Sequence, residues 1–235
     1  RRRMIRTPVV IMAGGLGTRL YPYTKILPKP LIPIGEVPIL ERVMDSFHSF
    51  GCEEFTLLVN YKKNMIKSYF SDTEKAYNIN WVEEDAPLGT GGGLSLLKGK
   101  MREAFFLTNC DTLVNADYGD IVKAHQKEGN AITMVCVMKQ FTIPYGVVEL
   151  GGGGEMAGIS EKPSLNYLVN AGLYLVEPEV VAQVADGVSQ GFPDIMEQCR
   201  ARGGRIGVYP IGEGSWMDMG QIEELDEMRR KFEQN

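Results

Sequence analysis

The chain has few of the residues on which several common chemistries depend. Of its 235 residues only two are histidines, His48 and His125, and neither has an obvious partner in the sequence. The sequence therefore suggests no Ser-His-Asp or Cys-His catalytic set. The four cysteines are widely spaced and form no C-x-x-C pair. This pattern is more typical of reduced thiols in a cytoplasmic protein than of a disulfide framework or a zinc site.

Long apolar runs and a surplus of basic residues are absent as well. No apolar run approaches the ~18 residues that a membrane-spanning helix requires, and the three arginines at 1–3 are not followed by the apolar stretch of a signal peptide. The net charge of −5 argues against a nucleic-acid-binding protein, since such proteins usually carry a basic surplus. We therefore expect a soluble cytoplasmic protein with neither nucleic-acid nor membrane partners.

Apolar strands alternate with helical patterns along most of the chain. This alternation predicts βαβ units around a mostly parallel sheet, that is, a doubly wound, Rossmann-like α/β fold. Two apolar segments, 146–150 and 156–160, flank four glycines and predict a β-hairpin within a β-rich second half. Further strands are expected at about 9–12, 55–59, 79–82, 104–107, 132–137, 167–176 and 206–210, and helices at about 38–47, 65–70, 90–97, 118–128, 192–201 and 221–232.

The segment 9–35 carries the most informative pattern. A short apolar strand is followed by a glycine-rich loop, then by Arg19, and then by Lys29 between two prolines. Glycines allow backbone N–H groups to approach a phosphate or a base, because no Cβ atom is in the way. The two cations add fixed positive charge to the same region. This combination predicts nucleotide binding, with chemistry on the phosphates.

Two familiar glycine-rich motifs do not fit this segment. A dinucleotide-binding fingerprint needs a third glycine where Leu20 stands, and a P-loop needs a lysine directly after its last glycine. Four prolines also fall where either motif would continue as a helix, whose interior tolerates proline poorly. Both interpretations are therefore rejected.

The whole string G-G-x-G-T-R-L-x-P-x-T-x-x-x-P-K-P-L-x-P-I-G, over residues 14–35, is far more specific than its glycines. It resembles the signature of the sugar-1-phosphate nucleotidylyltransferases, and the resemblance runs over nearly the whole chain. It implies a fold of the nucleotide-diphospho-sugar transferase type. It also implies the transfer of a nucleoside monophosphate from an NTP to a sugar 1-phosphate, with release of pyrophosphate.

Two aspartates match the metal-binding pair of that family. Asp111 follows a predicted strand, and Asp218 lies in a W-x-D-x-G motif. A lone aspartate at a strand end is usually a turn or cap residue, but two carboxylates suit Mg²⁺, which takes its other ligands from water and phosphate. The sequence departs from the family pattern at Cys110, where glycine is usual, and at Gln221, where threonine is usual. Neither change removes a charge.

The resemblance also assigns roles to individual positions. The second glycine loop, P-L-G-T-x-G at 87–92, resembles that of several guanylyltransferases, which makes GTP the first candidate nucleotide. The segment E-K-P at 161–163 and an N-x-G strand at 170–172 match the elements that bind the sugar and its phosphate. The predicted catalytic residues are Arg19, Lys29, Asp111 and Asp218, the last two also binding metal; the predicted nucleotide-binding residues are Ala13, Gly14, Gly15, Gly17, Thr18, Glu84, Leu88, Gly89 and Thr90; the predicted sugar-phosphate-binding residues are Gly146, Glu161, Lys162 and Asn170.

No internal repeat or linker divides the chain, so we expect a single domain over 1–235. Its parts are a nucleotide-binding part at about 8–138, a sugar-binding part at about 139–220 and a closing helix at 221–235. Two other functions stay open. One is a glycosyltransferase that uses NDP-sugars, although these usually carry a D-x-D motif. The other is an inactive sugar-nucleotide sensor, although such proteins typically lose one of the charged residues named above.

The sequence does not decide the oligomeric state. Relatives often form dimers or tetramers, which makes a homo-oligomer one expectation. Some longer relatives carry two small regulatory domains before the catalytic domain, and the chain begins with Arg1 rather than methionine. The sequence is therefore also consistent with part of a longer protein.

Overall fold

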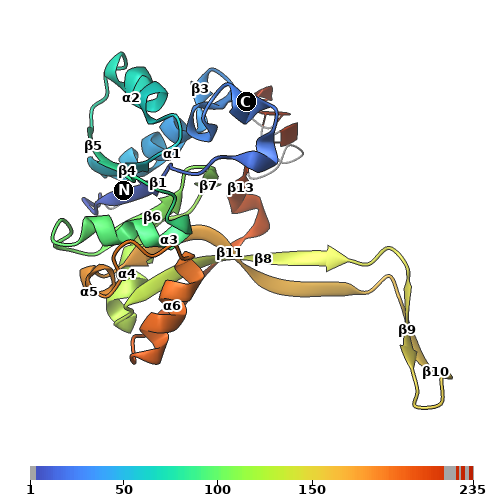
Figure 1. Cartoon of the computed structure of the whole chain (residues 1–235). Helices are drawn as coiled ribbons and strands as arrows, with labels where there is room; N and C mark the ends of the chain where they lie inside the picture. The colour runs from blue at the N-terminus through green and yellow to red at the C-terminus, as the bar shows by residue number, and fades with distance from the viewer. Residues whose placement is uncertain (1–3, 220–225, 228, 231–232, 235) are drawn as a thin grey trace.

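The computed structural model describes residues 4–219, 226–227, 229–230 and 233–234. Most of the predicted closing helix, 221–232, lies outside these described residues. The central sheet is made of β1 (Val9–Met12), β4 (Glu54–Val59), β5 (Asn78–Glu83), β6 (Phe105–Asn109), β8 (Ile132–Thr142), β11 (Ser164–Val176) and β12 (Ile206–Gly212). These seven strands lie in the order β12-β8-β11-β6-β1-β4-β5 (Figure 1).

The sheet is mostly parallel, as the sequence predicts. β1 pairs in parallel with both β4 and β6, β4 with β5, and β12 with β8. Only β11 runs antiparallel to its two neighbours in this sheet. The chain leaves β1 toward β4 and β5 and later returns to place β6 on the other side of β1. This reversal creates a switch point beyond the carboxyl ends of β1 and β6, where doubly wound sheets bind their ligands.

Helices cover both faces of the sheet. Successive strand residues point to opposite faces, so Val9 and Ile11 of β1 join one apolar cluster while Val10 joins the other. The first cluster includes side chains of α1 (Ile39–His48), α2 (Lys63–Ser71) and α4 (Tyr118–Glu128). The second includes side chains of η4 (Gly93–Leu97), α5 (Pro178–Ala182) and α6 (Phe192–Ala201). The result is the predicted three-layer α/β architecture.

Short elements add to this frame. Three 3-10 helices follow the glycine-rich loop, η1 (Thr18–Leu20), η2 (Tyr23–Lys25) and η3 (Lys29–Leu31), and η5 (Glu213–Ser215) lies near the C-terminus. Three small antiparallel pairs join β2 (Pro33–Ile34) to β3 (Val37–Pro38), β7 (Thr112–Val114) to β13 (Trp216–Asp218), and β9 (Gly146–Leu150) to β10 (Met156–Glu161).

The helix predicted at 90–97 has a different form. It is one α-helical turn, α3 (Gly89–Gly92), which continues as the 3-10 helix η4. Three glycines in a row, at 91–93, are poor helix formers because they lose the most backbone freedom on ordering. No helix in the described part of the chain is both long and apolar enough to cross a membrane.

The β-rich part predicted over 139–220 takes the form of an arm rather than a lobe. β8 and β11 continue past the edge of the body as a two-stranded ribbon, and the predicted hairpin, β9 and β10, lies at its far end (Figure 1). β12 and the inner half of β11 belong to the central sheet instead. The strand pattern was thus predicted correctly, while its placement depends on contacts that are distant in sequence.

We predict that Phe106→Ala lowers the free energy of unfolding by about 3–5 kcal/mol, because it opens a cavity at the centre of the first cluster. Phe106 is fully buried and its ring centroid lies 5.3 Å from that of Phe47 and 5.7 Å from that of Tyr118. Chemical denaturation measures the change. Val208→Ala, at a half-exposed position of β12, is the matched control and should cost less than about 0.5 kcal/mol.

Candidate active site

The glycine-rich loop after β1 is fixed to the body by a short relay of hydrogen bonds. Thr24, which is fully buried, donates its hydroxyl to the carbonyl of Gly17 at 2.7 Å. The Tyr61 hydroxyl in turn donates to the Thr24 carbonyl at 2.9 Å. Gly17 has φ of +66°, the left-handed region that favours glycine. The loop is therefore held in one shape by groups outside it.

The same segment brings Lys29 under the loop. A Cβ atom on Gly17 would lie 3.2 Å from the Cβ of Lys29, so the two backbones pass close to each other. Lys29 Nζ lies 2.5 Å from Asp111 Oδ2, and both side chains are largely buried. Burial lowers the pKa of Lys29, but the charge and hydrogen bond of Asp111, together with smaller contributions that include Asp218, raise that pKa above its usual value. Lys29 is consequently a fixed positive charge at physiological pH.

The two predicted metal-binding aspartates lie close together because of a pairing that the sequence analysis did not predict. β7 follows Asp111 directly and pairs with β13, so that Asp218 lies opposite Thr112. The Met219 N–H also donates to the Asp111 carbonyl at 2.9 Å. Asp218 is near enough to Lys29 to contribute to its raised pKa. Both carboxylates therefore act on the same ammonium group.

Cys110, which departs from the glycine that the resemblance implies, fits this geometry. Its side chain is buried, and burial raises the pKa of the thiol to about 12. The thiol is therefore neutral and adds no charge beside Asp111. The two histidines lie elsewhere: His48 Nδ1 lies 3.0 Å from the Cys52 carbonyl, and His125 is buried between Thr133 and Glu177. Neither reaches the aspartates.

The second glycine loop is bound to a segment that is distant in sequence. The N–H groups of Gly91 and Gly92 both donate to the Gln190 carbonyl. The Thr90 hydroxyl accepts a hydrogen bond from the Phe192 N–H at 3.1 Å, which caps α6. These contacts tie the loop to the start of α6, a segment about a hundred positions later, which no local pattern could reveal.

Glu84 follows β5 and lies between the two glycine loops. Its side chain is buried, and a Cβ on Gly14 would lie 3.3 Å from Glu84 Oε2. Desolvation raises the pKa of Glu84, and a hydrogen bond from the Leu88 backbone offsets part of this effect. Glu84 therefore presents a buried carboxyl group beyond the edge strand β5, whereas Lys29 is paired with Asp111 beyond β6, three strands away.

A cavity of about 400 Å³ brings most of the predicted residues together at the switch point of the sheet. Asp218 and Thr18 are not in its lining, although Asp218 acts on Lys29 from beside it. Pro87 and Asn109 line it without having been predicted; Asn109 is the last residue of β6, a position that could have indicated it. The predicted residues that line the cavity are Ala13, Gly14, Gly15, Gly17, Arg19, Lys29, Glu84, Leu88, Gly89, Thr90 and Asp111.

None of the four predicted sugar-phosphate residues lines this cavity. Gly146 and Glu161 pair with each other at the base of the β9–β10 hairpin, and Lys162 directly follows, between the hairpin and the ribbon. Asn170 lies where β11 enters the body, and its side chain serves the backbone: it accepts from the Gly172 N–H at 2.9 Å and donates to the Tyr174 hydroxyl. Gly172 in turn packs against Asn109, which lines the cavity, so Asn170 lies near the cavity, whereas the structure does not bring Gly146, Glu161 and Lys162 to Lys29 and Asp111 within one chain.

Comparisons with known proteins agree with the fold. A sequence profile of the nucleotidyl transferase family matches residues 8–235. The chain is 31% identical, over 92% of its length, to mannose-1-phosphate guanyltransferase of Aspergillus oryzae and spans 61% of that protein. It is 29% identical, over 94% of its length, to mannose-1-phosphate guanylyltransferase 1 of Arabidopsis thaliana and spans 66% of that protein.

The structural comparisons point the same way. The crystal structure of HddC from Yersinia pseudotuberculosis is similar with a TM-score of 0.75 and 24% sequence identity, over 96% of this chain and 99% of that one. The structure of HddC complexed with GMP-PN is similar with a TM-score of 0.74. At this level of identity the likeness establishes the fold.

We predict that Gly17→Ala destabilises the protein by about 1–2 kcal/mol, the usual cost of a left-handed conformation for a residue with a Cβ atom. The added methyl group would also lie 2.8 Å from Thr24 Cγ2, which forces the loop to shift. Thermal and chemical denaturation measure the loss. Gly15→Ala is the control, because no atom lies within 4 Å of the Cβ it would add. Equal effects of the two substitutions would contradict the role given to Gly17.

Proposed function

The chain belongs to the nucleotidyl transferase family, and we propose that it transfers GMP from GTP to a sugar 1-phosphate, releasing pyrophosphate and forming a GDP-sugar. The observation that carries the proposal is the meeting of Lys29, Asp111 and Asp218 at the end of a cavity that both glycine loops line. Mannose 1-phosphate is the first candidate sugar, because the relatives named above are mannose-1-phosphate guanylyltransferases.

This reaction needs charge neutralisation more than proton transfer. The nucleophile is a phosphate oxygen of the sugar 1-phosphate, which is largely ionised at neutral pH because its second pKa is about 6. No general base is required, which agrees with the position of both histidines outside the cavity. Two polyanions must instead be brought together in line. Lys29 would stabilise charge on the α-phosphoryl group, and Arg19 the departing pyrophosphate.

The carboxylates suit a divalent cation. Asp111 and Asp218 are adjacent through the β7–β13 pair, and no cluster of three or more candidate ligand side chains occurs among the described residues. Mg²⁺ fits such a pair, because it keeps several waters and takes its remaining ligands from phosphates. We propose that these two aspartates would hold Mg²⁺, which supplies neutralisation of phosphate charge when bound. The Lys29 ammonium would remain as the protein's own positive charge there.

The choice of GTP is supported by Glu84. A carboxylate only accepts hydrogen bonds, and guanine alone among the common bases presents two adjacent N–H donors, at N1 and N2, on its pairing edge. Glu84 lies at the end of the cavity away from Lys29, buried between Gly14 and the second loop. A base bound there would leave its triphosphate directed toward Lys29 and Arg19.

Two other functions are disfavoured by the residues that are present. A glycosyltransferase that uses NDP-sugars has no need of the proline-clamped Lys29, and the segment Asn109-Cys110-Asp111 is not a D-x-D motif. An inactive sensor has no need of a complete set of Arg19, Lys29, Asp111 and Asp218. The deciding assay is pyrophosphate release from five nucleoside triphosphates, with Mg²⁺, against a panel of sugar 1-phosphates. Release with GTP and one sugar supports the proposal; an NDP-sugar consumed without pyrophosphate release, or binding without turnover, supports the alternatives.

Lys29→Ala should lower kcat by about 100- to 1000-fold, the loss of ~3–4 kcal/mol that follows removal of one transition-state donor. The KM values for both substrates should change much less. Steady-state kinetics with the best substrate pair measures both. Lys100→Ala removes an exposed lysine that does not line the cavity and should leave turnover unchanged. Near-normal turnover of Lys29→Ala would rule out its proposed role.

Glu84→Gln should reduce kcat/KM for GTP by roughly 10- to 150-fold, since one of two charge-assisted hydrogen bonds, each worth about 1.5–3 kcal/mol, becomes a donor–donor clash. The values for ATP should change little, so the preference for guanine shrinks. Because burial raises the pKa of Glu84, kcat/KM for GTP should also fall on acidification at a higher pH than an ordinary carboxyl would dictate. Glu84→Gln should remove this dependence.

Glu83→Gln is the matched control for that substitution. Glu83 is the neighbouring residue, but its carboxylate is paired with Lys63 and Lys67 on the surface of the protein and does not line the cavity. This variant should keep the wild-type preference for GTP. If both variants keep that preference, Glu84 does not read the base.

A further inference from the structure

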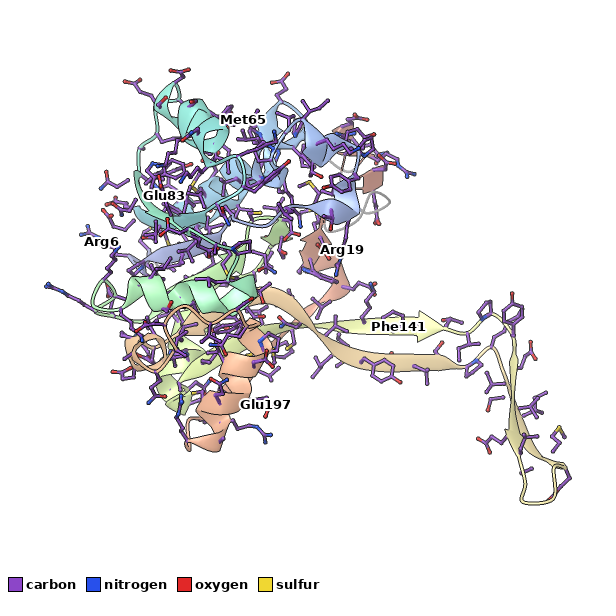
Figure 2. All side chains as sticks on the ribbon, viewed as in Figure 1. Arg6, Arg19, Met65, Glu83, Phe141 and Glu197 are labelled. Carbon is purple, nitrogen blue, oxygen red and sulfur yellow. The ribbon has the colours of Figure 1, made fainter. Side chains whose placement is uncertain are left out.

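The arm formed by residues 138–168 exposes many large apolar side chains for its length. Ten of the nineteen large apolar side chains that are exposed among the described residues lie on this short segment. Figure 2 shows Phe141 out on the ribbon, clear of the body. An isolated two-stranded ribbon is marginally stable in water. The arm therefore has the composition of an element that packs against another protein surface.

The strand register places three of these side chains, Phe141, Leu165 and Tyr167, on one face of the ribbon. Phe141 lies opposite Leu165, and Lys139 lies opposite Tyr167. Directly opposed residues share a face, so these two pairs continue the face that begins with Val137 and Val169 in the body. The other face begins near the body with the exposed apolar pair Met138–Leu168 and carries polar pairs toward the tip, Thr142 with Ser164 and Gln140 with Asn166. Such alternation is typical of a sheet that is buried on one side.

The hairpin at the tip continues the pattern. Val148 lies opposite Ile159, and both are exposed. Gly146 and Glu161 form the next pair on the same face, where a Cβ on Gly146 would lie 3.1 Å from Glu161 Oε2. Lys162, directly after, has φ of +43° and its N–H donates to the Tyr145 carbonyl at 3.2 Å. The predicted sugar-phosphate residues are thus attached to an apolar docking face.

The arm is not placed to reach the cavity of its own chain. Its ladder runs without interruption from the pair Thr142–Ser164 to the pair Cys136–Asn170 inside the sheet. The five ribbon positions beyond Val137 extend about 17 Å, at ~3.3 Å per residue, before the hairpin begins. Bringing Lys162 back to Lys29 within one chain would require these pairs to break. The ribbon thus directs the hairpin outward (Figure 1).

The body also exposes apolar side chains, in a segment that contributes to the cavity lining. Leu16, Tyr21, Tyr23 and Ile26 are all exposed, and they lie in the segment that also carries Arg19. Figure 2 places Arg19 on the side of the body from which the arm leaves. A second copy, related by a twofold axis, would present this surface to the arm of the first, and the reverse contact would form by symmetry. Both apolar surfaces would then be buried at once.

We propose that two copies of the chain exchange arms, so that Glu161 and Lys162 of one copy complete the active site of the other. The inference rests on the proposed function, because it assigns these two residues to the sugar 1-phosphate. Lys29 and Arg19 face the triphosphate, and Lys162 of the second copy supplies the cation for the phosphate dianion of the sugar. Each site is then shared between two chains, and a single chain binds nucleotide but lacks the sugar-phosphate half.

Complementation between two inactive variants tests this arrangement directly. Asp111→Asn disables the body and Lys162→Ala disables the arm. The two variant chains carry different affinity tags and are co-expressed, and the heterodimer is purified through both tags. Exchange restores one wild-type site per heterodimer, so that roughly half of the wild-type turnover per dimer returns. The Asp111→Asn and Lys29→Ala pair, which disables two bodies, is the matched control and should stay inactive.

The outcomes separate the two proposals. An Asp111→Asn and Lys162→Ala heterodimer as inactive as its parents, or the capture of no heterodimer through both tags, overturns arm exchange while the activity of the wild-type protein still supports the function. A wild-type protein that releases no pyrophosphate overturns the function.

Cross-linking tests the exchange without any activity. Lys162→Cys on one tagged copy and Arg19→Cys on the other are treated with a flexible bis-maleimide; the four native cysteines are buried. Exchange predicts a covalent dimer that carries both tags. The control replaces Arg19→Cys with Lys100→Cys, at an exposed position before β6 and so at the opposite end of the strand from Asp111. Equal yields from the two pairs, or no product from either, would overturn the proposal.

Discussion

The ion pair between Lys29 and Asp111 is the contact on which the site depends. It joins the proline-rich segment after β1 to the residue that follows β6, across the point where the order of the strands reverses. An ammonium group this far from water is stable only when carboxylates lie beside it, and Asp218 adds a second one through β13. Segments nearly two hundred residues apart are thereby fixed around one charge. The parallel strands on either side are rigid, so they hold these side chains in fixed relative positions.

As a result, the charged groups of the cavity are unevenly distributed. One end carries Lys29 and Arg19 beside the two aspartates, and the other carries the buried carboxyl group of Glu84. Between them the walls are mostly backbone, because the two glycine loops present few side chains. The neutral Cys110 thiol leaves this distribution unchanged. A ligand with a base at one end and phosphates at the other can satisfy both ends in only one orientation, which is the condition for in-line chemistry at the α-phosphate.

The arm has an apolar face that its own chain does not cover. Its alternating residues form a sheet face that is apolar on one side, yet the ribbon leaves the body before any helix can cover that side. Glu161 and Lys162, which we propose bind the sugar phosphate, lie where the ribbon meets its hairpin. Under the proposed arm exchange, the apolar contact that buries the ribbon would also deliver Lys162, so that completion of the site would depend on assembly.

The sequence by itself determined the fold class, the order of strands and helices, and most of the residues that line the cavity. These followed from the spacing of apolar residues, from the glycines and prolines that mark turns and the ends of helices, and from one long motif whose members lie close along the chain. Gly14, Arg19 and Lys29 belong to a single segment, so the chain itself brings them together. Local patterns carry such information because strands and turns are decided by neighbours a few residues away.

Only the tertiary structure decided the rest. The adjacency of Asp111 and Asp218 depends on a pairing of β7 with β13 between short strands that have no periodicity to detect. The N–H groups of Gly91 and Gly92 donate to the Gln190 carbonyl, and the approach of Gln190 depends on the packing of α6. The hairpin at 146–161 was predicted, but its distance from the cavity was not, because the direction in which a ribbon leaves a sheet is set by long-range strand pairing rather than by its own residues.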